Sequence, residues 1–295
     1  MSDGPQLATS RADLAAARAL MPGPVVLAPT MGALHDGHAR LLGAARTLAG
    51  PRGSVIVSIF VNPLQFGPNE DLDRYPRTLD ADLAMCAREG ADLVFAPAAA
   101  EIYPGGPPEV TVDPGPAGQR FEGEFRPGFF HGVLTVVLKL FSLVRPDIAV
   151  FGQKDAQQLA LVRQMAADFA LGIEIEGVPT VRAADGLALS SRNKYLSSSE
   201  RTVATVLHKA LAAGGAAAAR GPRAVLGEAQ RVLAENGAAL AVDYLALVSA
   251  GTYELVLSDD FSGPATLAIA ARLGRTRLID NVTIQVGTGR DAADD

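Results

Sequence analysis

Cysteine is almost absent from this chain of 295 residues, which contains Cys86 alone. A single cysteine excludes an internal disulfide framework and is typical of a protein from a reducing compartment. Because Cys86 lies within an apolar helical pattern, we expect a buried, unreactive thiol rather than a nucleophile. The chain also lacks an apolar run of membrane-spanning length, and residues 1–10 lack a basic segment followed by an apolar one. We therefore expect a cytoplasmic protein with no membrane partner.

An excess of positive charge is missing as well. Lys and Arg together number 26 against 32 Asp and Glu, which gives a formal net charge of −6. This balance argues against nucleic acid as a partner and against binding to anionic membranes. Lysine is scarce, being found only at positions 139, 154, 194 and 209. Lys154 and Lys194 each lie in a polar segment after an apolar run, where an ammonium group can contact phosphate; a solvated surface lysine fits equally well.

What the chain has in quantity is hydrophobic residues, at 48%, enough for a substantial core divided between two domains. Short runs rich in β-branched residues alternate with longer helical patterns, which predicts an α/β fold with a parallel sheet and right-handed crossovers. The expected strands are 25–28, 54–60, 92–95, 148–151 and 173–178, and the expected helices are 39–48, 79–88, 133–144 and 156–169. In such sheets ligands bind beyond the carboxyl ends of the strands.

The pattern changes from about residue 181. Alanine-rich helices are expected at 200–220 and 222–235, followed by strands at 242–248, 265–271 and 278–286. We therefore expect one domain at 1–180 and a smaller α/β domain at 181–295 that carries a lid. The alanine- and glycine-rich stretch 210–219 is typical of a flexible surface helix, and the acidic tail 287–295 is typical of disorder.

A pair of histidines follows the first expected strand, within the sequence Pro-Thr-Met-Gly-Ala-Leu-His-Asp-Gly-His at residues 29–38. A strand-to-helix junction presents backbone N–H groups and the positive helix end to anions, and Gly32 and Gly37 allow a polyphosphate to approach. As imidazolium ions, His35 and His38 would neutralise charge on a pentavalent phosphorus; as neutral rings each would donate one hydrogen bond. The chain has four histidines, and two lie in this turn. The segment predicts a nucleotide phosphate site.

Two other interpretations of His35 and His38 stay open. The pair could bind a metal ion, for which Asp36 is the only further ligand nearby. The histidines could also be incidental to an ordinary capped helix, because so short a motif arises by chance.

Two amides follow the second expected strand. Pro63 ends the strand and turns the chain outward, which makes Asn62 and Gln65 available to bind carboxylate or hydroxyl groups of a small substrate. A polar stretch that includes Asp71 continues to Arg77. An ordinary strand-terminal turn would give the same pattern.

The fourth expected strand is also followed by glycine, a polar cluster and a helix, at residues 151–158. Lys154 is placed to contact phosphate, and Gln158, one helical turn further on, faces the same side. Asp155 would also fit the N-cap of the helix. A later polar loop adds two hydroxyls and a guanidinium that suit a mobile lid over a triphosphate, at Ser190, Ser191 and Arg192.

Together these segments resemble the pantothenate synthetase family, the AMP-forming pantoate–β-alanine ligases. The resemblance covers nearly the whole chain, and its blocks are residues 29–38, 60–66, 75–78, 151–155, 190–193 and 276–281. Each block is modestly specific, whereas all of them in this order are very specific. The family is similar to the class I synthetase-like nucleotidyltransferases, which implies a Rossmann-like parallel sheet.

The resemblance implies a reaction in two steps. The pantoate carboxylate attacks the α-phosphorus of ATP to give pantoyl adenylate and pyrophosphate, and the amine of β-alanine then displaces AMP. No enzyme nucleophile is needed, so catalysis comes from positioning and charge stabilisation. The resemblance also implies a homodimer and Mg²⁺ bound mainly by phosphate oxygens.

By resemblance, His38 is the acid-type catalytic residue and His35 its companion, assisted by Lys154, Ser190, Ser191 and Arg192. The residues that match ATP-binding positions are Met31, Gly32, Ala33, Leu34, His35, Asp36, Gly37, His38, Gly152, Gln153, Lys154, Asp155, Val181, Leu189, Ser190, Ser191 and Arg192. Gln65 and Gln158 match residues that hold pantoate, and Gln65 also reaches toward β-alanine. Asn62 is a further candidate for binding the substrate. Asp82 matches an acidic magnesium ligand, and a solvated helix carboxylate is the alternative.

One segment departs from the family pattern, and two other functions stay open. The family commonly has His-Phe-x-Gly-Val before the long helix, whereas residues 129–133 here are Phe-Phe-His-Gly-Val, which displaces the imidazole by two positions to His131. Another nucleotidyltransferase of the same fold, acting on a different small substrate, would share the first turn. That function would not explain the presence of Asn62, Gln65 and Gln158. A nucleotide sensor would bind ATP without turnover.

Overall fold

The computed structural model describes residues 4–68, 70 and 72–287, and these form two compact units. The first unit contains the described residues up to Gln153 together with Leu161–Pro179, and the second contains Lys154–Ala160 and the described residues from Thr180 onward. Asp71 and the acidic tail from residue 288, for which disorder is predicted, lie outside the described residues.

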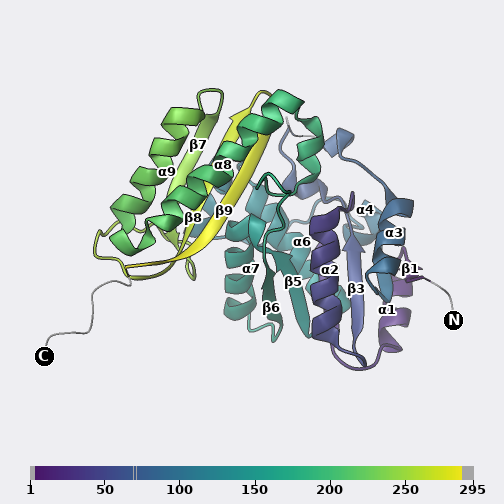
Figure 1. Cartoon of the computed structure of the whole chain (residues 1–295). Helices are drawn as coiled ribbons and strands as arrows, with labels where there is room; N and C mark the ends of the chain where they lie inside the picture. Colours follow the sequence, from purple (N-terminus) through teal and green to yellow (C-terminus); the bar gives the residue numbers. More distant parts are fainter. Residues whose placement is uncertain (1–3, 69, 71, 288–295) are drawn as a thin grey trace, which may run out of the picture. The chain divides into compact units, whose positions relative to one another are not determined.

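Six parallel strands form the sheet of the first unit, in the order β1-β4-β3-β2-β5-β6 (Figure 1). Their bounds are Gln6–Ala8 for β1, Val25–Thr30 for β2, Ser54–Ile59 for β3, Leu93–Phe95 for β4, Ile148–Gly152 for β5 and Glu174–Val178 for β6. The chain runs from β2 outward to β3 and β4, then crosses back to β5 and β6 on the other side of β2. The topological switch point therefore lies between β2 and β5, and the predicted parallel sheet is confirmed.

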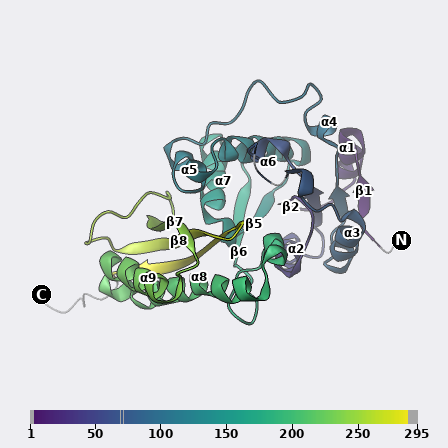
Figure 2. The same ribbon diagram turned by 90° about the horizontal axis from the view of Figure 1, so that it is seen from above.

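Helices cover both faces of this sheet, with α2 and α3 on one side and α1, α6 and α7 on the other (Figure 2). The bounds are Arg11–Ala19 for α1, Asp36–Ala49 for α2, Leu79–Arg88 for α3, Ala99–Ile102 for α4, Glu122–Phe125 for α5, Phe129–Val144 for α6 and Ala156–Asp168 for α7. Helix α6 has buried residues on most of its surface, which explains why its sequence is almost entirely apolar.

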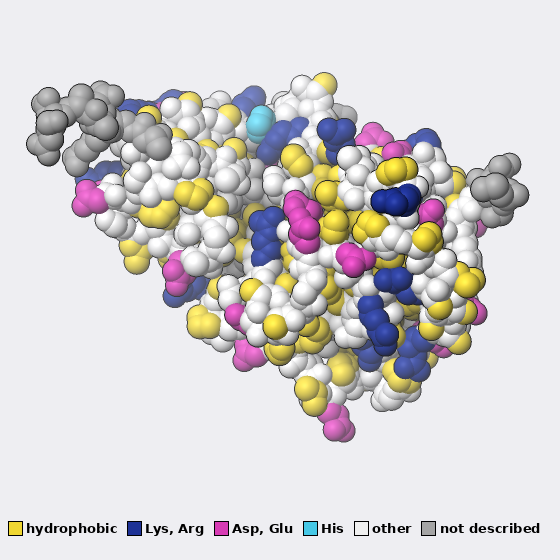
Figure 3. All heavy atoms as spheres, turned by 90° about the horizontal axis from the view of Figure 1, so that it is seen from below, with side chains coloured by type: hydrophobic (Ala, Val, Ile, Leu, Met, Phe, Trp, Pro, Cys, Tyr) yellow, Lys and Arg dark blue, Asp and Glu magenta, His cyan; other side chains and the backbone are white. Residues whose placement is uncertain are grey.

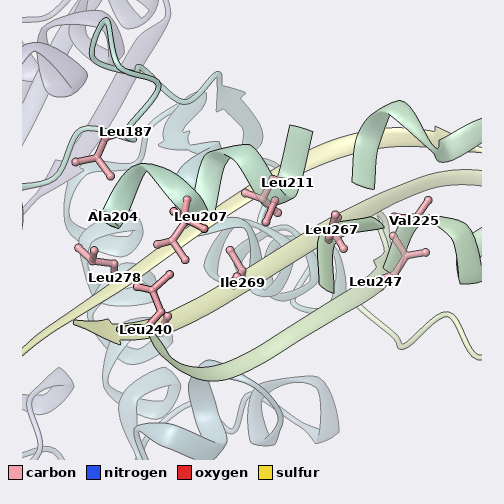
Figure 4. Packing of buried hydrophobic residues seen from close by; sticks show 14 of the residues in the cluster. Leu187, Ala204, Leu207, Leu211, Val225, Leu240, Leu247, Leu267, Ile269 and Leu278 are labelled. Carbon is pink, nitrogen blue, oxygen red and sulfur yellow. The ribbon is translucent and has the colours of Figure 1, made fainter. Parts of the chain in front are cut away.

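The second unit packs two helices against a three-stranded antiparallel sheet in the order β7-β8-β9. The bounds are Ser198–Ala216 for α8, Pro222–Asn236 for α9, Ala241–Ser249 for β7, Gly263–Leu273 for β8 and Thr276–Val286 for β9. Its core includes Leu207 and Leu211 of α8, Leu247 of β7, and Leu267 and Ile269 of β8 (Figure 4).

The predicted flexible surface helix at 210–219 is wrong. Ala210 and Leu211 are fully buried. A β-carbon added to Gly214 would lie 2.5 Å from Cδ2 of Leu267 and 2.9 Å from the carbonyl oxygen of Val225. The small residues therefore let α8 approach β8 and α9 closely. The alanine- and glycine-rich composition of this stretch reflects tight packing rather than exposure.

The surface carries charges of both signs. Basic and acidic side chains are interspersed over the face shown in Figure 3, as the modest net charge suggests. Among the described residues, no helix is both long and apolar enough to cross a membrane.

Candidate active site

The two predicted phosphate-binding segments both begin at the switch point of the sheet. Strands β2 and β5 are neighbours, with Val26 opposite Ile148 and Leu27 opposite Ala149. The histidine turn leaves the carboxyl end of β2, and Gly152 and Gln153 leave that of β5. This is the position at which doubly wound sheets bind their ligands.

The turn after β2 has a backbone conformation that requires glycine. Gly32 has a φ of +80°, and Ala33 follows at +51°. A β-carbon on Gly32 would lie 3.0 Å from both a carboxylate oxygen of Asp82 and Cγ2 of Ile59. The Thr30 hydroxyl fixes the start of the turn, because it accepts from the Gly32 N–H at 3.2 Å and donates to the Ser58 carbonyl at 2.8 Å.

Asp82 holds the middle of this turn from α3. One carboxylate oxygen accepts from the Ala33 N–H at 3.0 Å, and the other accepts from the Leu34 N–H at 2.8 Å and the Thr78 hydroxyl at 3.2 Å. Asp82 is 2% exposed, so the alternative of a solvated carboxylate is wrong. No group of three or more His, Cys, Asp or Glu in the described part of the chain could hold a metal ion. The magnesium role stays a prediction, and the observed role is to fix the turn.

His35 and His38 form the N-terminal cap of α2. Nδ1 of His35 accepts from the Gly37 N–H at 3.1 Å, and Nδ1 of His38 accepts from the His35 N–H at 3.3 Å. The ring centroids are 4.2 Å apart with an interplanar angle of 49°. Because both Nδ1 atoms are acceptors, each neutral ring carries its hydrogen on Nε2. The cap is therefore real, and it fixes the tautomer of both imidazoles.

Asn62 is buried shortly after β3 and precedes the short 3-10 helix Pro63–Gln65. Its Nδ2 donates to the Gly132 carbonyl and to Oε1 of Gln65, both at 3.1 Å. Its Oδ1 accepts from the Leu64 N–H at 3.3 Å and from the Tyr103 hydroxyl at 2.9 Å. Asn62 is 1% exposed, and these bonds use all four hydrogen-bonding positions of its amide. The arrangement favours a supporting role, and direct substrate binding by Asn62 stays a prediction.

Gln65 connects the 3-10 helix Pro63–Gln65 with the histidine turn. Its Nε2 lies 2.9 Å from Sδ of Met31, so these two predicted site residues are in contact. Its backbone carbonyl accepts from Arg126 at 3.2 Å. Arg126 in turn binds Glu70 at 2.6 Å and stacks over the ring of Phe129 at 3.6 Å.

His131, the displaced imidazole, lies on α6 with a side chain that is 44% exposed. Its Nε2 is 3.9 Å from a carboxylate oxygen of Asp113. Phe129 occupies the position where the family commonly has histidine, and it offers Arg126 an aromatic face without a hydrogen-bonding nitrogen.

The remaining predicted site residues lie in the second unit, where β9 connects them. Lys154, Asp155 and Gln158 belong to this unit, and the Lys154 carbonyl accepts from Nδ2 of Asn281 at 2.8 Å. The neighbouring Asp280 binds Arg182 through two bonds of 2.6 and 3.0 Å. In the block at 276–281, Asp280 and Asn281 therefore hold Arg182 and the backbone of Lys154 in place, a role that the sequence did not reveal.

Arg182 lies at the base of a hairpin that leads to the predicted lid. The Leu189 N–H donates to the Val181 carbonyl at 2.9 Å, which closes the hairpin. Ser190 then caps the short helix Ser191–Tyr195 by accepting from the Arg192 N–H at 3.3 Å. The predicted residues Val181, Leu189, Ser190, Ser191 and Arg192 thus form one continuous segment attached to β9 through Arg182.

Comparison with known proteins assigns the chain to a family. A sequence model described as pantoate-beta-alanine ligase matches residues 6–283. The chain belongs to the pantoate–β-alanine ligase family.

Relatives of this ligase family match over most of their length. The chain is 56% identical to a pantothenate synthetase of Nocardioides sp. (strain ATCC BAA-499 / JS614), covering 98% of this chain and 88% of the relative. It is 59% identical to that of Thermobifida fusca (strain YX), covering 89% and 90%.

Solved structures of ligases of this family show the same fold. The pantothenate synthetase of Thermus thermophilus has a TM-score of 0.86 and 44% identity, covering 94% of this chain and 98% of that one. The ligase of Francisella tularensis, complexed with beta-gamma ATP and beta-alanine, has a TM-score of 0.75 and 31% identity, covering 94% and 97%. The predicted family, fold class and ligase activity are confirmed.

Three residues that support the candidate site residues Asn62 and Gln65 were missed in the sequence. Tyr103 bonds to Asn62, and Arg126 bonds to the Gln65 carbonyl while it is held by Glu70, but nothing in the local sequence of these three residues indicates this. Only the folded chain brings these distant segments together.

Proposed function

We propose that this chain joins pantoate to β-alanine in two steps, through pantoyl adenylate, with release of pyrophosphate and then AMP. The observation that supports this most is the turn from Thr30 to His38 at the switch point, with both imidazoles held by Nδ1. It presents an anion-binding helix end where the fold binds ligands. The match to the ligase family supplies the substrate class.

In the first step the pantoate carboxylate attacks the α-phosphorus of ATP. Nε2 of His38 and of His35 donates hydrogen bonds to phosphate oxygens as negative charge builds up on them. Lys154 and the lid residues Ser190, Ser191 and Arg192 add hydroxyl and cationic contacts to the phosphates. Pyrophosphate leaves, and no covalent bond to the enzyme forms.

Pantoate is held by Gln65 and Gln158, whose amides suit its carboxylate and hydroxyl oxygens. In the second step the amine of β-alanine attacks the acyl carbon of the adenylate, and AMP leaves. Cys86 takes no part, because it is buried and desolvation raises its pKa to about 11.

Magnesium accompanies ATP in this proposal, bound by phosphate oxygens that it partly neutralises. Asp82 is a poor primary ligand because both of its carboxylate oxygens already accept hydrogen bonds from the turn. We further propose that the enzyme is a cytoplasmic homodimer, in which residues 1–180 bind ATP and pantoate and residues 181–295 carry the lid.

The test is to incubate the purified protein with ATP, magnesium and pantoate, and to measure pyrophosphate and AMP with and without β-alanine. We expect pantoate-dependent pyrophosphate, with AMP released when β-alanine is added. A nucleotide product other than AMP would favour another nucleotidyltransferase, and ATP binding without any turnover would favour a sensor.

A further inference from the structure

Two backbone groups next to the Asn62 amide favour one of its two orientations. The Leu64 N–H can only donate, and it faces Oδ1 at 3.3 Å. The Gly132 carbonyl can only accept, and it faces Nδ2 at 3.1 Å. Rotating the amide by 180° would set donor against donor and acceptor against acceptor. The backbone therefore favours one orientation of Asn62, which further partners of its Oδ1 can reinforce.

This orientation determines how Gln65 presents its amide. Because Nδ2 of Asn62 donates to it at 3.1 Å, the inner atom of the Gln65 amide is the oxygen. The NH₂ group then lies on the side of Met31, where the histidine turn begins. Gln65 consequently offers a donor to the site, which is complementary to a carboxylate or hydroxyl oxygen.

The backbone of Gln65 is held equally firmly. A β-carbon on Gly132 would collide with the carbonyl of Leu64, so α6 packs directly on the 3-10 helix. With side chain and backbone both constrained, the outward donor of Gln65 has a defined direction.

Tyr103 completes the set of partners around Asn62. Its hydroxyl donates to Oδ1 at 2.9 Å, which fills the second acceptor position of that oxygen. The ring is 6% exposed and packs edge-on against Phe60, with Nζ of Lys139 at 5.2 Å from its centre. Burial raises the pKa of the hydroxyl to about 12, so it remains a donor at physiological pH.

We propose that Tyr103 is a positioning residue for the pantoate-binding amide, acting through Asn62 to fix the direction of the NH₂ group of Gln65. This inference rests on the proposed role of Gln65 in binding pantoate. The Tyr103 hydroxyl reaches Gln65 only by way of Asn62, so we expect its loss to alter the constant for pantoate selectively.

The experiment measures steady-state AMP formation by the full chain, varying pantoate and ATP separately. Tyr103→Phe keeps the ring and its packing and removes only the hydroxyl. We expect kcat/KM for pantoate to fall about 10-fold, the scale of one lost buried hydrogen bond, with kcat/KM for ATP nearly unchanged. Tyr253→Phe is the matched control, a buried tyrosine of the second unit, and it should change neither constant.

A double-mutant cycle tests whether Tyr103 acts through Gln65. In a Gln65→Ala background, Tyr103→Phe should cause no further loss in kcat/KM for pantoate. Gln65→Glu tests the orientation, because it keeps the inner oxygen and replaces the outward donor by a carboxylate oxygen. We expect this variant to lose pantoate affinity at least as severely as Gln65→Ala.

Three results would overturn the inference: normal pantoate kinetics in Tyr103→Phe, equal losses for pantoate and ATP, or additive losses in the cycle. If Gln65→Ala itself leaves pantoate kinetics intact, the proposed role of Gln65 fails and the inference fails with it. If Gln65→Ala is impaired but Tyr103→Phe is not, the function stands and only the role of Tyr103 is refuted.

Discussion

Individual side chains in this ligase take their roles from the backbone groups that face them. Asp82 and Asp80 lie on the same helix, but Asp82 is buried against the turn after β2, whereas Asp80 is exposed. His35 and His38 resemble a metal pair in the sequence, but both use Nδ1 to cap α2. Residue type therefore defined the candidates, and the facing N–H groups defined what each of them does.

Asp82→Asn should distort the turn after β2, for which we propose ATP binding. An amide can accept from only one of the two N–H groups of Ala33 and Leu34, and its NH₂ group faces the other donor. We expect kcat/KM for ATP to fall by about 10- to 100-fold, with Asp80→Asn as the unaffected control. The measurement is pyrophosphate release over a magnesium titration. Recovery of activity at high magnesium would instead show that Asp82 is a metal ligand.

His38→Ala should slow adenylation by on the order of 10²-fold, with ATP binding affected less, because Nε2 stabilises charge that develops in the transition state. His38→Asn separates this role from the helix cap, since its oxygen can still accept from the His35 N–H. We expect single-turnover pyrophosphate release to be equally slow in both variants and normal in His131→Ala. Near-normal rates in His38→Asn would reduce the role of His38 to capping.

At the scale of elements, the interiors of helices and strands were predictable and their ends were less so. Helix α3 has the predicted bounds of Leu79–Arg88, because its apolar periodicity is clear. Helices α2 and α6 begin three and four residues before the predicted 39 and 133, because their N-caps are His35 and Gly128 rather than Ser, Thr, Asp or Asn, whose side chains mark a helix start most clearly. Strand β1 and helix α1 were missed, although the capping box of Ser10 and Asp13 was a usable signal.

Two glycines on the paired helices α8 and α9 should respond oppositely to alanine. Gly214→Ala places a methyl group against Leu267 and Val225 and should destabilise the chain by about 1–3 kcal/mol. Gly227 is exposed on α9, with nothing within 4 Å of an added β-carbon, so Gly227→Ala should stabilise by about 0.5–1 kcal/mol. Urea unfolding of both variants measures the difference. Equal effects would contradict the close packing of α8.

At the scale of the whole molecule, the proposed site residues are divided between two units. The histidine turn, Asn62 and Gln65 belong to the first unit, whereas Lys154 and the segment from Val181 to Arg192 belong to the second. The chain passes from the first unit to the second just after β5, at Lys154, returns to the first at Leu161 and enters the second again at Thr180. Because some of the proposed site residues belong to the second unit, we expect unfolding of that unit to reduce activity.

Lowering the pH should destabilise the second unit through His208. Burial, and then the positive charge of Arg182, lower the pKa of His208 below 6.5, against a smaller opposing effect of Asp280. Its Nδ1 is buried without a hydrogen-bond partner among the described residues. The unfolded state therefore binds the proton more readily, and the contribution present above pH 6.5 is lost as the pH falls through the folded-state pKa.

The measurement is the urea midpoint at about pH 7.5 and about pH 5.0, on either side of the ordinary histidine pKa. We expect the drop between the two values to be smaller in His208→Leu than in the unaltered chain. An unchanged drop in His208→Leu would show that other groups cause the pH dependence.

From the sequence alone we could derive the parallel sheet, the family, and the two turns after β2 and β5 for which we propose phosphate binding. These depend on local periodicity, glycine positions and motif order, all of which are properties of neighbouring residues. Tertiary structure alone decided that Asp82 holds the turn, that Tyr103 and Arg126 support Gln65, and that Asn281 holds Lys154. Such contacts join residues that are distant in the chain, and a buried polar group gains its partner only when the fold brings the two segments together.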